Sequence, residues 1–532
     1  MKLKLLVVVL PLAFAAAQPH AVPVSEKPVA LYKGLGAWKH PIATANPEAQ
    51  RFFDQGLALL YGFNRYEALR SFRKAAELDP QAAMAYWGMA MAQGPYINMD
   101  GDPSYDLKGA CAAVEAGRKL ATAPERERAY LHAVAAWCPE YRPAAYVEAA
   151  RDLAARYPDD LDAVTIYAES LLIPVRWHWY APDGTPSAGV AEAERALEEV
   201  LRRWPEHPGA NHYYIHAVES SRTPERAIAS AQRLMGVVPW AGHMVHMPGH
   251  IWLLFGDWET AANVNERAAE VDREYFSASG VAGTYMPYYL HNLHFIVYAR
   301  EMQGRKADAL HAAERMAAEL RPMAEAMPEM ADVFLAIPML AYVRFGEWDY
   351  LLKMAQPGAG MKISTVMWRY ARALALAARG DRAGAERERD AFQKLGGEIP
   401  AGQPWGQNKT SDVLAMVAEI LAARVAASPQ EAVGHWRRAV EMQDALAYDE
   451  PPDWYYPLRE SWGAALVRAG QAAEAETVFR EGVKRSPRNG RMLFGLMESL
   501  RAQGKTEQAA LVQREFDANW SKADVRLRLE EM

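Results

Sequence analysis

The stretch PEAQRFFDQGLALLYGFNRYEALRSFRKAAELDP, residues 47–80, decides the fold of this 532-residue chain. It places Gly56, Ala68, Phe72 and Pro80 in the order small, small, aromatic, proline. Small residues let two helices cross closely, and a proline ends the second helix. This order is typical of a helix–turn–helix unit of about 34 residues. The stretch therefore predicts a hairpin of two antiparallel helices.

The same order returns near the other end of the chain. Residues 456–487 contain Gly463, Ala475, Phe479 and Pro487, and runs of alternating β-branched residues are nearly absent. We therefore expect an all-α, tetratricopeptide-like helical-repeat superhelix of about ten to twelve helical pairs. Further units begin in the sequence near His291, Ala331, Val366, Asp412 and Gly490.

The first residues have the pattern of a targeting segment. Lys2 and Lys4 precede the apolar run LLVVVLPLAFAAA, and small residues before Gln18 fit a cleavage site. We predict a signal peptide over 1–17, an extended segment over 18–46 and a solenoid over 47–532. An uncleaved membrane anchor is the alternative. The prediction is an exported, periplasmic protein without stable membrane insertion.

Composition argues against a nucleic-acid partner and leaves open whether the two cysteines form a disulfide. The formal net charge is −7 and no basic stripe is present, which argues against nucleic acid as a partner. The two cysteines, Cys111 and Cys138, do not form a C-x-x-C motif. Export permits a disulfide between them, and two buried free thiols are the alternative.

Two histidine pairs lie one repeat apart in the predicted central histidine-rich repeats, residues 208–316. His212 and His216 stand in NHYYIH, and His246 and His250 stand in HMPGH. Both offsets are 34 residues (246 − 212 and 250 − 216), the length of one repeat. Neighbouring units place equivalent positions side by side. We therefore expect the four imidazoles on one wall of a concave groove.

Three more histidines extend this arrangement into a grid. His243 precedes the second pair, and His291 and His294 lie in HNLHF. The repeat register aligns His294 with His212 and His246, and it puts Tyr298 one turn later. Seven imidazoles in one groove would repel if protonated and would leave many nitrogens needing partners. A cation removes both problems, so the grid predicts a metal site.

Histidine ligands indicate a transition metal but do not identify which one. Imidazole suits copper, iron and zinc, and seven histidines exceed the ligands of one zinc ion. Two metals, or one metal with supporting imidazoles, fit this number. A polar network without metal and the capture of an anion by protonated imidazoles are the alternatives.

Two acidic residues and one aromatic insertion complete the candidate site. Glu219 lies one turn after His216, and Glu169 has the position equivalent to His216 in the preceding unit. With Tyr298, they are candidates for supporting groups or a base, or else ordinary charges in a solvated groove. Trp177, His178 and Trp179 form either a lid or an apolar plug. The segment AYDEPPDWYYP, from Ala447, also departs from the repeat, and such insertions can cap a groove.

The histidine motifs also carry a resemblance to a known group of proteins. HYYIHAVESSRTPERA, GHMVHMPGHIW and PYYLHNLHF resemble exported bacterial tetratricopeptide proteins of unassigned biochemistry, as do both ends of the mature chain. That family has serine where this chain has Gly249. The resemblance implies the repeat fold and marks the histidines as functional, but it supplies no reaction.

These observations support two classes of function. The first is an exported metalloprotein whose groove holds a histidine-ligated transition metal, either for catalysis or to store and pass on the ion. The second is a scaffold that binds a peptide or protein partner without metal. A peptide or small molecule in the groove is compatible with both.

Overall fold

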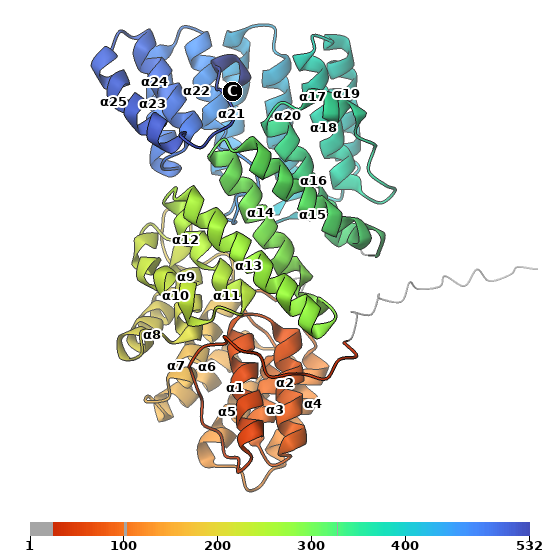
Figure 1. Ribbon diagram of the computed structural model, residues 1–532, viewed down its shortest axis with the longest axis vertical. Coiled ribbons are helices and arrows are strands. Elements are labelled where there is room, and N and C mark those ends of the chain that lie inside the picture. The colour runs from red at the N-terminus through yellow and green to blue at the C-terminus, as the bar shows by residue number, and fades with distance from the viewer. Residues whose placement is uncertain (1–24, 100–103, 327) are drawn as a thin grey trace, which may run out of the picture.

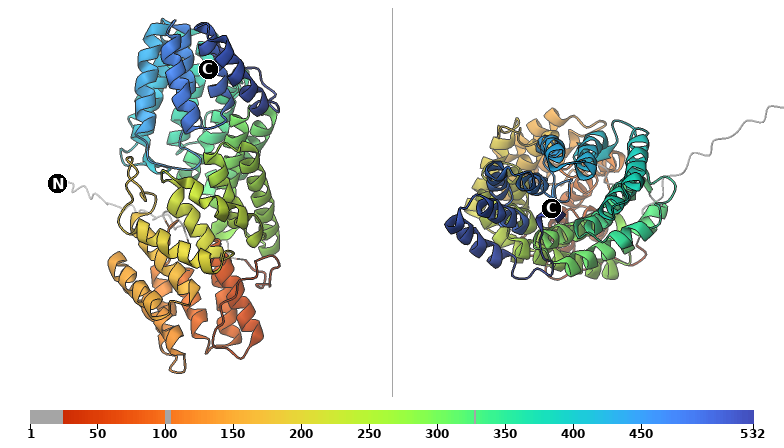
Figure 2. Two further views of the ribbon diagram at one scale, coloured as in Figure 1. Left: turned by 90° about the vertical axis from the view of Figure 1, so that its left-hand side faces the viewer. Right: turned by 90° about the horizontal axis from the view of Figure 1, so that it is seen from above.

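The computed structural model describes residues 25–99, 104–326 and 328–532, and most of them lie in α-helices (Figure 1). The first helices lie at one end of the long axis and the last at the other, and the chain winds about that axis (Figure 2). The expected signal peptide, 1–17, lies outside these residues. No helix in the described ranges has the length and apolar character needed to cross a bilayer.

The helices of the first half pair in chain order. Residues 25–46 precede them without regular secondary structure. The helices are α1 (Pro47–Tyr61), α2 (Arg65–Leu78), α3 (Ala83–Met91), α4 (Leu107–Arg118), α5 (Glu125–Ala135), α6 (Pro143–Arg156), α7 (Leu161–Leu172), α8 (Val190–Arg203), α9 (Pro208–Glu219), α10 (Ile228–Val237), α11 (Gly242–His246), α12 (Pro248–Leu254) and α13 (Trp258–Ser279), with short 3-10 turns at η1 (Ile173–Val175) and η2 (Pro224–Ala227).

The second half continues the same pattern. A short hairpin, β1 (Pro404–Trp405) with β2 (Asn408–Lys409), interrupts it. The helices are α14 (Met286–Met302), α15 (Lys306–Ala326), α16 (Pro328–Arg344), α17 (Trp348–Lys353), α18 (Lys362–Ala378), α19 (Arg382–Gly396), α20 (Thr410–Val425), α21 (Pro429–Asp444), α22 (Arg459–Arg468), α23 (Ala472–Arg485), α24 (Gly490–Ala502) and α25 (Thr506–Asn519), with η3 (Gly283–Tyr285) and η4 (Leu529–Glu531).

The repeat residues have the packing roles that the sequence predicts. The buried ring of Phe72 in α2 fills the space left by Gly56 in α1 and Gly88 in α3, where any side chain would collide with it. Phe479 has the same relation to Gly463 and Gly495. With α11 and α12 counted as one interrupted helix, α1 to α25 form twelve consecutive pairs within the described residues. The expected all-α, tetratricopeptide-like superhelix is confirmed.

The extended segment before α1 ties distant units together. Trp240 donates its backbone N–H to the Gly34 carbonyl at 3.0 Å, and its ring stacks on Tyr32. His40 Nδ1 lies 2.7 Å from Asp162 in α7. Helix α1 also packs against α9, eight helices further along the chain. These contacts close the superhelix here, so its inner face encloses a space and is not an open groove.

Covalent bonding adds a further constraint to the first half. Cys111 in α4 and Cys138, just after α5, form a disulfide. This outcome decides between the two alternatives that the sequence left open. The disulfide links α4 to the end of α5, the two helices on either side of the loop around residue 120.

Candidate metal centre

Four helices in the middle of the molecule, α9, α11, α12 and α14, supply the seven predicted histidines (Figure 1). Helical spacing puts His212 and His216 on one face of α9. Pro248 has no backbone N–H and begins α12, so the helical hydrogen bonding is interrupted between His246 and His250. Five of the seven histidines are at most 2% exposed: His212, His216, His243, His246 and His250.

The first histidine set consists of His212, His216 and His243. Its three members each offer a nitrogen within 4.8 Å of the other two. His212 Nε2 and His243 Nε2 are 3.1 Å apart. His216 Nε2 is buried and has no hydrogen-bond partner among the described residues. One side of this set therefore presents a nitrogen lone pair that nothing in the described protein satisfies.

The second histidine set consists of His246, His250 and His291. The nitrogens they offer also lie within 4.8 Å of one another. His246 Nε2 and His250 Nε2 are 2.7 Å apart, and the rings of His246 and His291 have centroids 4.8 Å apart. Phe295 packs edge-on to His246 at 4.7 Å. The two sets thus repeat one arrangement in neighbouring units.

Glu219 connects the two sets. Its Oε1 accepts from His216 Nδ1 at 2.8 Å, and its Oε2 accepts from His250 Nδ1 at 2.5 Å. Burial alone would raise the pKa of Glu219, but His250 and His216 hold it at about 2. The carboxylate is therefore ionised and acts as acceptor to both rings. It orients one histidine of each set and leaves both Nε2 atoms facing inward.

The hydrogen bonds around the second set fix its tautomers. Asn265 donates Nδ2–H to the Ala261 carbonyl at 2.8 Å, so its Oδ1 accepts from His246 Nδ1 at 2.6 Å. His250 Nδ1 carries a proton toward the ionised Glu219. In a neutral imidazole only one nitrogen is protonated. With both rings neutral, both Nε2 atoms would present lone pairs to each other at 2.7 Å, an arrangement that a shared proton or a metal cation would relieve.

The pKa shifts of the histidines disfavour a proton as the cation between these rings. Burial holds the pKa of His246 well below its ordinary value, and the charge of a protonated His250 would add to the shift. Burial also lowers the pKa of His250, although Glu219 opposes this. Burial lowers the pKa of His294 to about 3. The same cause, with neighbouring imidazoles, places the pKa well below the ordinary range in His212, His243 and His291.

A segment from the far end of the chain covers the centre. Glu450, in the segment 447–457 between α21 and α22, has Oε1 3.3 Å from His250 Nδ1. Its Oε2 is buried without a partner among the described residues. Burial raises the pKa of Glu450 well above its ordinary value, and Glu219 and Asp449 add to this. Glu450, Glu219, His216 and His250 also offer atoms within 4.8 Å of one another.

A cavity of about 630 Å³ adjoins these groups, and we call it the histidine cavity. Five of the seven histidines line it: His216, His243, His250, His291 and His294. The remaining wall is mainly aromatic and proline-rich, with the acidic groups of the 447–457 segment at one side. It includes Tyr96, Trp177, Pro287, Tyr288, Trp405, Asp449, Glu450, Pro451, Asp453 and Tyr455.

Two aromatic residues beside His216 have backbone conformations that side chains other than glycine rarely adopt. Phe63 has φ of 56° and Trp177 has φ of 63°. The Phe63 ring stacks near His216 and His243, and the Trp177 ring meets His216 edge-on. Backbone strain of this kind persists only where the surroundings hold it, and it gathers at functional sites.

The structure separates several predicted residues from the two sets. His294 lines the histidine cavity but belongs to neither set, and His291 lies beside His246 and His250 in its place. Glu169 interacts with Arg65 and Tyr213, and burial raises its pKa to about 7. Tyr298 packs against Trp258 in the apolar core. The repeat register alone put these residues too close to the centre.

The aromatic insertion divides between the two roles that the sequence left open. Trp177 lines the histidine cavity, which fits a wall or lid. Trp179 is fully buried with its ring 5.8 Å from that of His216, which fits an apolar plug. His178 is exposed to solvent.

Sequence reasoning missed three groups that complete the centre. Asn265 orients His246, Phe63 packs against His212 and His243, and Glu450 approaches His250. The departure of AYDEPPDWYYP from the repeat was the available signal for Glu450. Asn265 and Phe63 carry no such signal, because they stand at ordinary helical and turn positions.

Comparison with known proteins adds little to this description. No family model matches the chain. An uncharacterized protein of Aquifex aeolicus (strain VF5) is 40% identical over 60 residues, 11% of this chain. The chain spans only 8% of that relative's length.

Solved helical structures align over most of the chain but at low similarity. Yeast Tom70 has 10% identity over 88% of this chain and 90% of its own, with a TM-score of 0.30. A human IFIT1 dimer with m7Gppp-AAAA has 11% identity over 82% and 90%, with a TM-score of 0.33. The P58(IPK) TPR domain has 13% identity over 86% and 99%, with a TM-score of 0.20. At TM-scores below 0.5 these likenesses support no conclusion about this chain.

Proposed function

We propose that this chain is a metalloprotein whose two histidine sets each bind a transition-metal ion, copper, iron or zinc. The observation that carries the proposal is the pair of inward lone pairs on His246 and His250, 2.7 Å apart. Ligating histidines in metalloproteins commonly donate their other N–H to a carboxylate, amide or backbone carbonyl. His212 meets this description through the Tyr61 carbonyl, at 2.6 Å from Nδ1.

The principal alternative is a proton in place of the metal. A protonated His250 would donate to Glu219 and to His246 and would form a buried ion pair. The lowered pKa values of the surrounding histidines oppose this, and His216 Nε2 would remain unsatisfied. Anion capture is disfavoured further, because the nearest ionised group is Glu219 and the cavity wall carries three more acidic side chains.

The histidine cavity favours catalysis over simple storage. Each set provides three protein ligands, the number typical of catalytic zinc sites that keep an open position, whereas structural sites are closed by four. A bound ion would act as a Lewis acid toward a small molecule in the cavity. Aromatic rings such as Trp177 and Trp405 would pack on that molecule. Glu450, with its raised pKa, is placed to give or take a proton beside His250.

The disulfide supports the proposal that the protein is exported. Disulfides persist in oxidising compartments such as the bacterial periplasm and are rare in the cytosol. The Cys111–Cys138 bond therefore favours the periplasmic location proposed from the leader pattern.

Metal titration tests the proposal. Untagged protein stripped with a chelator is titrated with Co²⁺, Zn²⁺ and Cu²⁺ separately, and bound metal is counted by mass spectrometry after dialysis. We expect two ions per chain for at least one metal. An added small anion such as azide should change the Co²⁺ absorption spectrum if a coordination position is open. Binding of none of these metals would overturn the metal assignment, and binding without a response to azide would overturn the catalytic one.

A further inference from the structure

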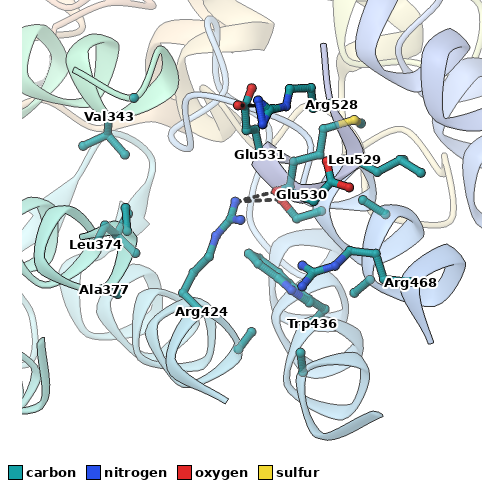
Figure 3. A pocket seen from close by; sticks show the side chains of 18 of the residues that line it. Val343, Leu374, Ala377, Arg424, Trp436, Arg468, Arg528, Leu529, Glu530 and Glu531 are labelled. Atoms are coloured by element: carbon teal, nitrogen blue, oxygen red, sulfur yellow. Dashed lines mark hydrogen bonds and ion pairs between the residues drawn. The ribbon is translucent and has the colours of Figure 1, made fainter. Parts of the chain in front are cut away.

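A second cavity, of about 800 Å³, lies between the helices of the last units. The α-helices that form its wall contribute no acidic side chain to the lining, but they contribute four arginines: Arg344, Arg424, Arg468 and Arg491. We therefore call it the arginine cavity. Its apolar lining includes Tyr370, Trp436 and Tyr455. Figure 3 shows Arg424 and Trp436 rising from neighbouring helices into it.

The positive charge of this wall is only partly compensated. Arg344 forms a bidentate ion pair with Glu460, at 2.6 and 3.0 Å. Arg491 is 7% exposed, and its Nε has no partner among the described residues. Burial, with Arg344 beside it, lowers the pKa of Arg491 to about 10. The wall therefore favours an occupant that brings negative charge or carbonyl oxygens.

Residues 525–532 occupy part of the arginine cavity. Arg424 and Ser461 both donate to the backbone oxygen of Met532, at 2.5 and 2.7 Å. Met532 is only 4% exposed. At the other end, Asp524 accepts from the backbone N–H groups of Lys306 and Ala307 at 2.6 and 2.9 Å.

This segment lies in the cavity as an extended peptide. Up to η4 its side chains alternate: Val525, Leu527 and Leu529 are half-buried, whereas Arg526 and Arg528 are exposed. An extended chain points alternate side chains to opposite sides. Its fixed points are Asp524 before it and Met532 at its end, so it covers the wall without forming a helical pair with it.

We propose that the arginine cavity is a binding site for an extended acidic peptide segment of a partner protein, and that residues 525–532 occupy it in cis until such a segment displaces them. The partner peptide would place aliphatic residues at alternate positions, as Val525, Leu527 and Leu529 do. Its acidic groups would pair with Arg468 and Arg491, for which residues 525–532 supply no described partner. This proposal does not rest on the metal centre, although Tyr455 lines both cavities.

A truncated variant ending at Asp524 tests the proposal, with its fold checked by circular dichroism and thermal unfolding. The probe is a fluorescein-labelled peptide with the sequence of residues 525–532, VRLRLEEM, measured by fluorescence anisotropy. We expect one peptide to bind per truncated chain and at least about tenfold weaker binding to the full chain. A tethered segment competes at an effective concentration in the millimolar range. Arg424→Gln in the truncated chain should weaken binding.

Charge is tested with two further peptides. VELELEEM should bind the truncated chain more tightly than VRLRLEEM, and VRLRLKKM should bind more weakly. Equal affinities for the acidic and basic peptides would overturn the acidic character of the partner.

A second variant keeps the test decisive if the truncated chain does not fold. In the full chain, Leu529→Lys with Met532→Lys should release the segment, because two apolar contacts are lost and the added cations face the arginine wall; faster hydrogen exchange over residues 525–532 would report this. The released chain should then bind VELELEEM. A folded variant, truncated or released, that binds none of the three peptides would overturn the site altogether.

Discussion

The two interior cavities of this superhelix differ in the charge they require. The histidine cavity presents imidazoles and acidic side chains, and we propose that a cation completes it. The arginine cavity presents guanidinium groups, so it is completed by carbonyl or carboxylate oxygens, some of which residues 525–532 already provide. Both cavities lie in one continuous series of helical pairs. The repeat fixes the backbone, and a few inward positions determine which ligand each region accepts.

The two regions also differ in how they are closed. The 447–457 segment forms part of the wall of the histidine cavity, and α1 and the 25–46 segment close the superhelix beside it. The arginine cavity is covered by one extended segment held at Asp524 and Met532. In our two proposals, the first cavity holds metal ions on buried ligands, whereas the second needs a cover that can leave.

Removing one ligand from each set should have the largest effect on this contrast. The double variant His216→Ala with His250→Ala leaves two histidines in each set, too few for a stable site. We expect complete loss of stoichiometric metal, measured by elemental analysis, with helix content retained because repeat units contact mainly their neighbours. His178→Ala, an exposed histidine, is the control and should bind metal normally. Full occupancy in the double variant would remove both residues from the ligand set.

The buried pair of His40 and Asp162 lies outside the metal centre and tests whether a histidine there contributes to stability instead of metal binding. His40, His207, Tyr61 and Trp38 all contact Asp162. We expect Asp162→Asn to reduce the free energy of unfolding by about 3–5 kcal/mol, because removal of one partner leaves buried groups uncompensated. Metal content per folded chain should be unchanged. Asp152→Asn, at an exposed ion pair with Arg156, should cost about 0.5 kcal/mol or less.

The same pair predicts the sign of a pH dependence. Burial opposes both charges, but the hydrogen bond to Asp162 raises the pKa of His40, and those from His207 and His40 hold the pKa of Asp162 well below its ordinary value. The stabilisation from Asp162 is lost as pH falls below about 4, and that from His40 is lost as pH rises above about 6.5. The difference between wild type and Asp162→Asn in chemical denaturation should therefore be greatest between these values. A pH-independent difference would contradict the ion pair.

Glu219→Gln should have an intermediate effect that reaches both sets. The amide has one acceptor oxygen, so it can accept from only one of His216 and His250. Its NH₂ group would face the other ring and favour the tautomer that blocks Nε2. We expect metal affinity to fall about 10- to 100-fold, as for other groups that orient ligands. Competition with a chelator of known affinity measures this, and an unchanged affinity would exclude Glu219 as the orienting group.

Gly249→Ala should have the smallest effect. A Cβ at this position would lie 2.5 Å from Asn265 Nδ2, so the amide that orients His246 must shift. We expect a few-fold loss of affinity at the second set alone, within the range for such supporting groups. Gly236→Ala is the matched control, because its Cβ would meet nothing within 4 Å. Equal affinities in the two variants would show that the Asn265 contact does not matter.

Local periodicity in the sequence predicted how neighbouring units pack. The 34-residue offset anticipated that the pairs His212/His216 and His246/His250 lie side by side, because repeat units stack on their neighbours. The order of small and aromatic residues predicted the contacts of Phe72 and Phe479 for the same reason.

Long-range closure could not be predicted from that periodicity. The position of Glu450 beside His250, 200 residues away (450 − 250), depends on the curvature summed over many repeats and on an irregular segment. The register placed His294 at the histidine cavity, which it lines, but it did not show that His291 is the member of α14 close to His246 and His250. The tautomers depend on Asn265 and Glu219 together, which no sequence pattern displays.

Anomalous X-ray diffraction from crystals of metal-loaded protein tests the central claim most directly. Data collected at the absorption edge of the bound metal locate each ion without reference to the protein atoms. We predict two peaks, one among the Nε2 atoms of His212, His216 and His243, and one among those of His246, His250 and His291. A protein that has no anomalous peak at these imidazoles, or that binds its metal only elsewhere, such as at His40 and Asp162, would contradict the account.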